Sequence, residues 1–342
     1  MVIKRKDRIL VFGFFGFRSN TSDGQDIKTR NLYDLLCEKM PDRITFFDTQ
    51  SLRFRRFRYI VMLWRILSAG TVIYLPAQNN LKRFFPFLFS LSSLFGIRIY
   101  YFVVGGWLPS YIKGKQKLIN RLKRIEHIFT ETLLMKNALE QDSGFSNVSV
   151  CPNFRIHSFK AHPQQSNEKL KIVFMSRIMA QKGIAMVFKY ASSVGEKAVI
   201  DFYGPVSAID QEYFANEIEK HSNTNYRGFL DPTLIYSTLS EYDVLVLPTM
   251  FYTEGLPGAI IDAYIAGIPV VVTRWMHASE FVVHGSTGFI VPFENGYQEF
   301  EYALNEIDRD RAMLLSMKQN AMEYSRSFSS EAVWEVLKHI FK

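Results

Sequence analysis

Short runs of valine, isoleucine, leucine and phenylalanine alternate with helical patterns along the whole chain, and this alternation constrains the fold more than any other feature. Runs without a polar face are typical of parallel strands that helices cover on both sides. The sequence therefore predicts an α/β protein with two doubly wound parallel sheets, one in each half. The predicted strands are Ile9–Phe15, Ile44–Phe47, Val72–Leu75, Ile97–Val104 and Ile128–Thr130, then Lys171–Ser176, Ala198–Tyr203, Asn225–Gly228, Val244–Pro248, Pro269–Thr273 and Gly288–Val291.

The charge of the chain changes sign between its two halves, although the formal net charge of the 342 residues is +8. Residues 1–165 contain 26 lysines and arginines against 11 acidic residues, whereas residues 166–342 are acidic overall. The polar stretch 158–169 coincides with this change and is predicted to be a linker. We therefore expect an N-terminal domain at 1–165, a C-terminal domain at 166–322 and a last helical segment at 323–342.

Arginines alternate with aromatic residues in the most basic part of the first half. The clearest segments are Arg53–Arg58 and Lys82–Phe89, and no acidic residue occurs between Asp48 and Glu126. Basic and aromatic side chains together favour the interface of an anionic membrane, so residues 53–89 are predicted to bind such a surface. The alternatives are ordinary amphipathic helices with solvated arginines, and a site for single-stranded nucleic acid. We expect no nucleic-acid partner, because no RNA-binding or helix-turn-helix signature is present.

The strongest local pattern lies at 254–271, where a loop, a helix, a turn and a buried strand follow one another. Glu254 comes after the predicted strand Val244–Pro248, so we expect its carboxylate at the carboxyl end of a parallel sheet, where open α/β sheets bind ligands. Asp262 lies on the helix that follows and can accept hydrogen bonds from a ribose diol. Free backbone N–H groups at the start of this helix can serve a phosphate; the residues concerned are Gly255, Leu256 and Gly258, with Pro257 in the first turn.

A second pattern places two cations after the first predicted strand of the second half. Arg177 and Lys182 lie five residues apart in the segment 176–183, which leads from that strand into a helix. Two cations on such a turn can clamp a diphosphate, and arginine can do so through two hydrogen bonds at once.

These two segments resemble retaining GT-B glycosyltransferases of family 4. The stretch 254–262 is similar to the E-x7-E region of that family, with Asp262 at the second acidic position, and 176–183 is similar to its G-R-x-x-x-x-K-G segment, with serine at the first position. The resemblance implies two Rossmann-like domains that face a cleft, with the C-terminal helix crossing back to the N-terminal domain. It also implies catalytic roles for Glu254, Arg177 and Lys182, and recognition of the nucleobase by backbone groups of Phe229 and Leu230.

In the first half the resemblance rests on Asp23–Arg30, which is similar to the D-G-Q-x-I-K-T-R form associated with bacterial polysaccharide-assembly transferases. It implies that Gly24 and Gln25 face the donor diphosphate and that Lys28 and Arg30 contact the acceptor or a donor phosphate. Many relatives carry a histidine that faces the donor sugar, but the equivalent stretch 103–108 has none. Its residues are instead expected on the acceptor side; they are Gly105, Gly106 and Trp107.

The resemblance implies a retaining, metal-independent glycosyltransferase that moves a hexose or N-acetylhexosamine from a nucleotide diphosphate sugar to a saccharide acceptor. We expect a lipid-linked acceptor, a role in bacterial capsule, exopolysaccharide or O-antigen assembly, and a cytoplasmic enzyme that is peripheral on the inner face of the cytoplasmic membrane. No cofactor is expected beyond the nucleotide sugar as co-substrate, and the seven histidines show no metal-ligand spacing. The alternatives are a GT-B nucleotide-sugar epimerase and a non-catalytic membrane-binding subunit of a polysaccharide assembly complex.

Overall fold

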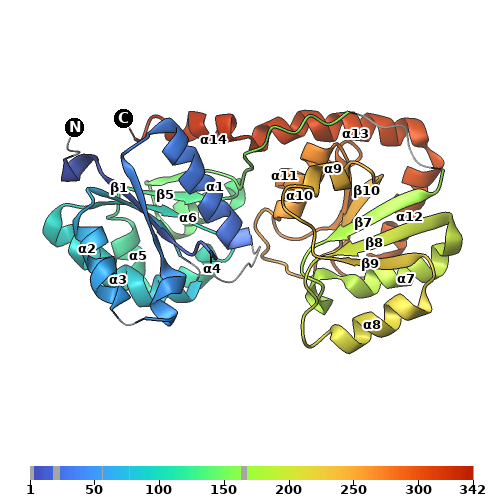
Figure 1. Cartoon of the computed structure of the whole chain (residues 1–342), viewed down its shortest axis with the longest axis horizontal. Helices are drawn as coiled ribbons and strands as arrows, with labels where there is room; N and C mark the ends of the chain where they lie inside the picture. Colours follow the sequence, from blue (N-terminus) through green and yellow to red (C-terminus); the bar gives the residue numbers. More distant parts are fainter. Residues whose placement is uncertain (1–3, 18–23, 56, 77, 163–167, 342) are drawn as a thin grey trace. The chain divides into compact units, whose positions relative to one another are not determined.

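The computed structural model describes residues 4–17, 24–55, 57–76, 78–162 and 168–341 (Figure 1). The chain forms two compact units, one made of Met1–Ile156 and Ser330–Lys342 and the other of His157–Ser329. Each unit contains one six-stranded sheet in which every pair of neighbouring strands is parallel. The predicted α/β fold class with two doubly wound sheets is therefore confirmed. Asp23 and Arg56 lie outside the described residues.

The N-terminal sheet has the strand order β2-β1-β3-β4-β5-β6. The strands are β1 (Ile9–Gly13), β2 (Ile44–Asp48), β3 (Thr71–Leu75), β4 (Arg98–Phe102), β5 (His127–Thr130) and β6 (Val148–Val150). The first five correspond to the predicted strands, whereas β6 was not predicted, because a strand of three residues gives almost no periodic signal. Chain order reverses between β1 and β3, so a switch point lies at their carboxyl ends.

Helices cover both faces of the N-terminal sheet. On one face Leu10 and Phe12 of β1 belong to a core cluster with residues of α2 and α3. On the other face Ile9 and Val11 belong to a cluster with residues of α1 and α14, so the last helix is part of this unit. The helices are α1 (Gly24–Lys39), α2 (Arg58–Leu67), α3 (Gln78–Phe95), α4 (Leu108–Ile112), α5 (Gln116–Leu122), α6 (Leu133–Ser143) and α14 (Ser330–Leu337). Within the described part of the chain, no helix combines the length and apolar composition needed to cross a bilayer.

The C-terminal sheet has the strand order β12-β11-β10-β7-β8-β9, so its switch point lies between β7 and β10. Its six strands correspond to the six predicted runs of the second half. They are β7 (Leu170–Met175), β8 (Ala198–Tyr203), β9 (Thr224–Gly228), β10 (Val244–Leu247), β11 (Val270–Thr273) and β12 (Gly288–Val291).

A buried ion pair fastens the long helix α13 to the C-terminal sheet. Lys318 Nζ lies 2.9 Å from Asp243 Oδ1, next to the start of β10, and both side chains are almost fully buried. The other oxygen, Asp243 Oδ2, accepts the backbone N–H of Lys171 at 3.0 Å. The helices of this unit are α7 (Ile184–Val194), α8 (Gln211–Lys220), α9 (Ile235–Leu239), α10 (Gly258–Ala266), α11 (Ala278–Phe281), α12 (Tyr297–Arg309) and α13 (Arg311–Ser325).

Candidate active site

The candidate site of the C-terminal unit lies at the switch point, at the carboxyl ends of β7 and β10. Lys182 ends the short 3-10 helix η3 (Ala180–Lys182), which follows β7, and Glu254 lies in the loop between β10 and α10. Gly183 lets these two loops meet: its φ is +81°, and a Cβ at this position would lie 1.9 Å from the carbonyl oxygen of Pro248. Because only glycine tolerates both conditions, the sequence here specifies a close approach of two backbones.

Lys182 and Glu254 contact each other directly. Lys182 Nζ donates to Glu254 Oε2 at 2.5 Å, and the hydroxyl of Thr249 donates to the same oxygen at 3.1 Å. Thr249 is itself held, because its carbonyl oxygen accepts the hydroxyl of Thr273 at the end of β11 at 2.5 Å. A lysine that uses one N–H for a carboxylate keeps two for another acceptor. The pair can therefore bind an anion with the lysine while the carboxylate stays fixed.

Arg177 lies in the loop directly after β7, and its side chain is exposed. The backbone of this loop is held against the loop after β8: Ile178 N donates to Pro205 O at 2.9 Å, and Ser207 N donates to Ile178 O at 2.8 Å. Gly204 makes the contact possible, since a Cβ there would lie 1.9 Å from Ser176 O. The structure thus places Arg177 and Lys182 in one rigidly anchored segment.

The start of α10 presents backbone N–H groups next to Glu254 in the chain. Gly255, Leu256 and Pro257 are buried, Pro257 precedes the first helical residue Gly258, and no side chain caps the helix. Uncapped N–H groups at a helix start are suited to oxygen acceptors such as phosphate. Asp262 lies in the middle of the same helix with only 5% of its surface exposed.

The expected base-recognition residues follow β9. Gly228 has a φ of +76°, after which Phe229 is 54% exposed and Leu230 is partly buried against the core. Beside them a polar cluster, which the sequence did not indicate, is centred on the buried carboxylate of Asp201. Its Oδ2 accepts Arg227 Nε at 3.0 Å and the hydroxyl of Tyr242 at 2.6 Å. Burial, and then the hydrogen bond to Asp201, raise the pKa of Tyr242, so its hydroxyl remains a donor.

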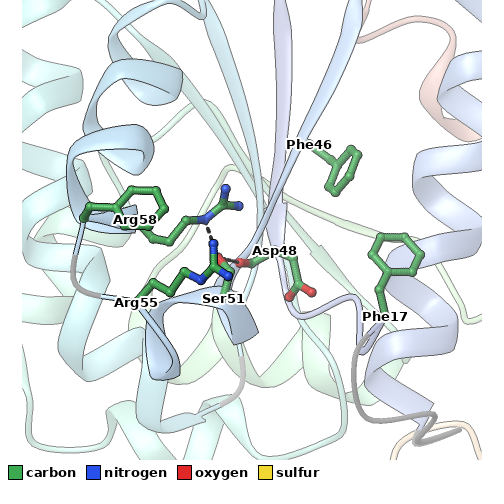
Figure 2. A pocket seen from close by; sticks show the side chains of 7 residues that line it. Phe17, Phe46, Asp48, Ser51, Arg55 and Arg58 are labelled. Carbon is green, nitrogen blue, oxygen red and sulfur yellow. Dashed lines mark hydrogen bonds between the residues drawn. The ribbon is translucent and has the colours of Figure 1, made fainter.

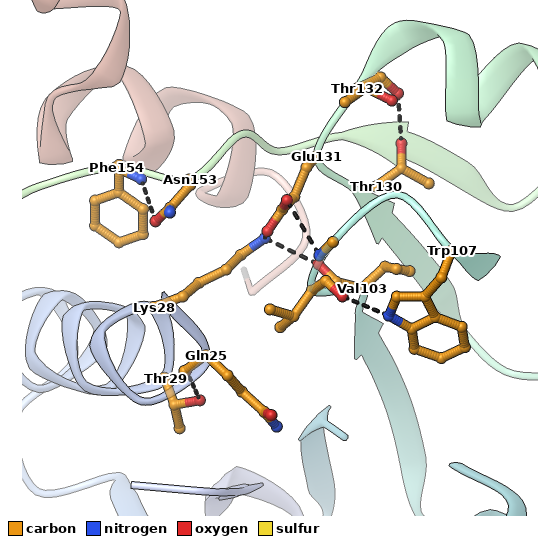
Figure 3. A network of polar contacts seen from close by, with 12 residues as sticks. Gln25, Lys28, Thr29, Val103, Trp107, Thr130, Glu131, Thr132, Asn153 and Phe154 are labelled. Carbon is orange, nitrogen blue, oxygen red and sulfur yellow. Dashed lines mark hydrogen bonds and ion pairs between the residues drawn. The ribbon is translucent and has the colours of Figure 1, made fainter. Parts of the chain in front are cut away.

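A buried network lies at the carboxyl ends of β4 and β5 in the N-terminal unit (Figure 3). Lys28 reaches from α1 to Glu131 Oε1 at 2.8 Å and to the carbonyl oxygen of Val103 at 2.9 Å. The other carboxylate oxygen, Glu131 Oε2, accepts the backbone N–H of Gly105 at 3.2 Å. Lys28 and Glu131 are only 2% and 3% exposed. Lys28, expected at a phosphate or acceptor, therefore uses its charge inside the unit, where it fixes the loop that carries Gly105.

The other N-terminal candidates lie on α1 or in the glycine loop that follows β4. Gly24 is exposed at the start of α1, and Gln25 Nε2 donates to Leu75 O at the end of β3 at 3.4 Å. Arg30 forms an ion pair with Asp26 at 3.2 Å, one turn earlier in α1. The glycine loop itself contains Gly105 with a φ of +81°, a buried Gly106, and Trp107, whose Nε1 donates to Val104 O at 2.6 Å.

Glu131 is a residue of this network that the sequence analysis did not single out. The available signal was an acidic residue directly after the predicted strand Ile128–Thr130. For a metal ion, the described residues offer no group of three or more His, Cys, Asp or Glu side chains in a ligating arrangement.

The fold and the site together describe a protein with two parallel α/β units. A lysine–glutamate pair lies at the switch point of the sheet in the second unit. Residues 169–310 match the family model described as Glycosyl transferases group 1, so this part of the chain is similar to the domains of that family. It contains Arg177, Lys182, Glu254 and Asp262.

Two relatives and one solved structure illustrate the similarity. The chain is 25% identical over 182 residues to the Staphylococcus aureus protein named capsular polysaccharide biosynthesis glycosyltransferase CapM, covering 51% of this chain and 46% of that protein. It is 28% identical over 180 residues to WcaL of Salmonella typhimurium, which is named for colanic acid biosynthesis; the match covers 48% of this chain and 43% of that protein. The matched region thus spans less than half the length of either relative.

The crystal structure of Anabaena HepE in complex with UDP-glucose superposes with a TM-score of 0.76 at 15% sequence identity, covering 97% of this chain and 98% of that chain. At this identity the likeness concerns the fold alone. It agrees with the two six-stranded parallel sheets, and the fold of the chain is GT-B.

Proposed function

We propose that this chain is a retaining glycosyltransferase, which moves a hexose or an N-acetylhexosamine from a nucleotide diphosphate sugar to a saccharide acceptor. The observation that carries the proposal is the Lys182–Glu254 pair at the switch point of the unit that matches the glycosyl transferases group 1 model. Such a pair supplies the two charges that this chemistry uses. The cation serves the leaving diphosphate, and the carboxylate serves the hydroxyls of the sugar.

In the proposed reaction the bond between C1 of the sugar and the diphosphate oxygen breaks, so negative charge accumulates on the diphosphate. Lys182, Arg177 and the N–H groups at the start of α10 stabilise this charge, and no metal ion is needed for it. Glu254, fixed by Thr249, orients the sugar. The acceptor hydroxyl attacks from the face that the diphosphate leaves and gives its proton to a diphosphate oxygen, so the anomeric configuration is retained.

The remaining donor contacts follow from the same unit. Asp262 on α10 accepts hydrogen bonds from the ribose, while backbone groups of Phe229 and Leu230 bind the nucleobase. The exposure of Phe229 supports this assignment, because the loop after β9 is open to solvent at this residue.

The proposed acceptor is a lipid-linked saccharide, and the protein acts in the cytoplasm as a peripheral protein on the inner face of the cytoplasmic membrane. Support comes from α2, which begins in the arginine-rich segment and exposes Tyr59, Ile60 and Trp64. Aromatic and aliphatic side chains beside arginines are suited to an anionic membrane interface. The names of the relatives, capsular polysaccharide and colanic acid biosynthesis, support a role in bacterial polysaccharide assembly.

The test is a panel of nucleotide diphosphate sugars incubated with the full chain, with and without a membrane lipid extract, and with and without EDTA. We expect one donor to release its nucleoside diphosphate, faster with the extract and equally fast with EDTA, and the anomeric proton coupling of the product to match that of the donor. Formation of a new nucleotide sugar without release would indicate an epimerase. If no donor releases its nucleoside diphosphate and none is converted to a new nucleotide sugar, the chain is a non-catalytic binding subunit and the proposal is wrong.

A further inference from the structure

A hollow of about 200 Å³ lies in the N-terminal unit at the carboxyl end of the edge strand β2 (Figure 2). Asp48 ends this strand, Ser51 belongs to the 3-10 helix η2 (Thr49–Arg53), and Arg55 and Arg58 lie where the chain turns into α2. Three phenylalanines complete the lining, namely Phe17, Phe46 and Phe57. The glycosyltransfer site proposed above uses none of these residues.

The two arginines of the hollow form no ion pair with a carboxylate among the described residues. Arg58 Nε donates to the hydroxyl of Ser51 at 3.2 Å, which is a neutral acceptor. Asp48 is the acidic residue of the lining, and its Oδ1 already accepts the backbone N–H groups of Gln50 at 2.9 Å and Phe15 at 3.2 Å. Two guanidinium groups against one carboxylate leave the hollow with a net positive charge.

The kind of anion follows from the cations and the size of the hollow. Guanidinium groups bind phosphate through two parallel hydrogen bonds, and the N-terminus of the ten-residue helix α2, which begins at Arg58, adds a partial positive charge. At about 200 Å³ the hollow is smaller than the roughly 300–1,000 Å³ of sites that enclose a drug-sized ligand. It therefore suits a phosphate group, and the rest of the ligand lies outside.

The surroundings of the hollow are apolar and open to solvent. Phe17 is 55% exposed, Phe57 is 53% exposed, and α2 also exposes Ile60 and Trp64. Exposed aromatic and aliphatic side chains next to an anion subsite favour a ligand in which the phosphate carries an apolar chain. An inorganic phosphate or a nucleotide would leave these side chains in water.

We propose that the hollow binds the phosphate group of an amphiphilic phosphate ester, with Arg55 and Arg58 on the phosphate and the three phenylalanines on the first part of the apolar chain. Two sources supply this chemistry: the lipid phosphate of a lipid-linked acceptor, which rests on the function proposed above, and an anionic phospholipid of the membrane.

Farnesyl phosphate, kept below its critical micelle concentration, is the probe, and calorimetry measures its Kd for the full chain. The double variant Arg55→Gln/Arg58→Gln should bind it about a hundredfold more weakly, since two charge-assisted contacts are lost. The matched control is Lys113→Gln/Lys117→Gln, which removes the same charge from two exposed residues of the same unit that lie outside both 53–89 and the lining of the hollow; it should bind as the parent does. Inorganic phosphate should bind far more weakly than farnesyl phosphate to the parent.

The proposal would be overturned if both double variants lost the same affinity for farnesyl phosphate, or if the parent bound inorganic phosphate as tightly as farnesyl phosphate.

Asp48→Asn adds an independent check. The substitution removes the carboxylate charge but keeps an acceptor oxygen, so it should tighten farnesyl phosphate binding; weaker binding by a folded protein would count against the hollow. Vesicles that contain an anionic phospholipid distinguish the two sources of the phosphate ester. If the vesicles compete with farnesyl phosphate, the hollow binds a phospholipid headgroup; if they do not compete, it binds the lipid phosphate of the acceptor. If binding behaves as expected but no donor is turned over, the hollow stands and the glycosyltransferase proposal fails.

Discussion

Lys182→Ala tests the central pair most directly, because it changes two interactions at once. The substitution removes the cation proposed to contact the diphosphate. It also leaves Glu254 with only the Thr249 hydroxyl at Oε2, where Lys182 Nζ lay at 2.5 Å. The freed carboxylate then faces the negatively charged diphosphate. Both effects should weaken binding of a free nucleoside diphosphate.

The size of the loss follows from these two terms. A hydrogen bond to a charged group contributes about 1.5–3 kcal/mol. Two unit charges about 6 Å apart at an effective dielectric constant of about 20 repel by roughly 3 kcal/mol. The two terms add up to about 4.5–6 kcal/mol. Because the pair is partly open to solvent, which screens its charges, we expect a smaller loss of about 3 kcal/mol, or a Kd roughly a hundredfold weaker.

Isothermal titration with UDP, and separately with GDP, measures this affinity. Lys189→Ala is the matched control, because Lys189 is an exposed lysine of α7 in the same unit, with its ammonium over the ring of Tyr297. The double variant Lys182→Ala/Glu254→Gln should regain about tenfold, since the repulsive carboxylate is gone. If Lys182→Ala and Lys189→Ala bind as the parent does, Lys182 does not contact the diphosphate and the reasoning is refuted.

Three further outcomes are expected. Glu254→Gln should lower kcat and keep nucleoside diphosphate affinity, whereas Asp262→Asn should weaken that affinity; the reverse pattern in kinetics and calorimetry would exchange their roles. Lys28→Met leaves Glu131 buried without its cation and should destabilise the protein by about 3–5 kcal/mol in urea unfolding; a change below about 1 kcal/mol would contradict the network. Trp64→Ser should reduce sedimentation with anionic vesicles, and equal pelleting of variant and parent would argue against the membrane surface.

The fold could be predicted from the sequence because most of its strands are buried on both faces. All five residues of β1 and of β3 are buried, and each strand contains an apolar run, Ile9–Phe12 or Val72–Leu75, that is visible without any partner. β6 escaped because Val148–Val150 is short, and two of its three residues are only partly buried.

The candidate site could be predicted only as far as its motifs are local. Arg177 and Lys182 stand five residues apart, and Glu254 and Asp262 stand eight apart, so their spacing is informative. Their contacts are not local: Lys182 meets Glu254 across 72 residues, and Lys28 meets Glu131 across 103. A sequence pattern indicates which residue follows a strand. It does not indicate which two strands end side by side, because that depends on the order of the strands in the sheet.

The two lysine–glutamate pairs show how one arrangement serves different purposes. In each unit a lysine on the segment after the first strand of its sheet meets a glutamate from a loop that follows a later strand. Lys28 also donates to Val103 O, so it has two acceptors and a fully buried ammonium, and its effect is to hold the loop that carries Gly105. Lys182 has one carboxylate partner and lies more open to solvent, with two N–H groups left for a ligand. The number of internal acceptors therefore separates the lysine that positions a loop from the lysine that we propose binds a phosphate.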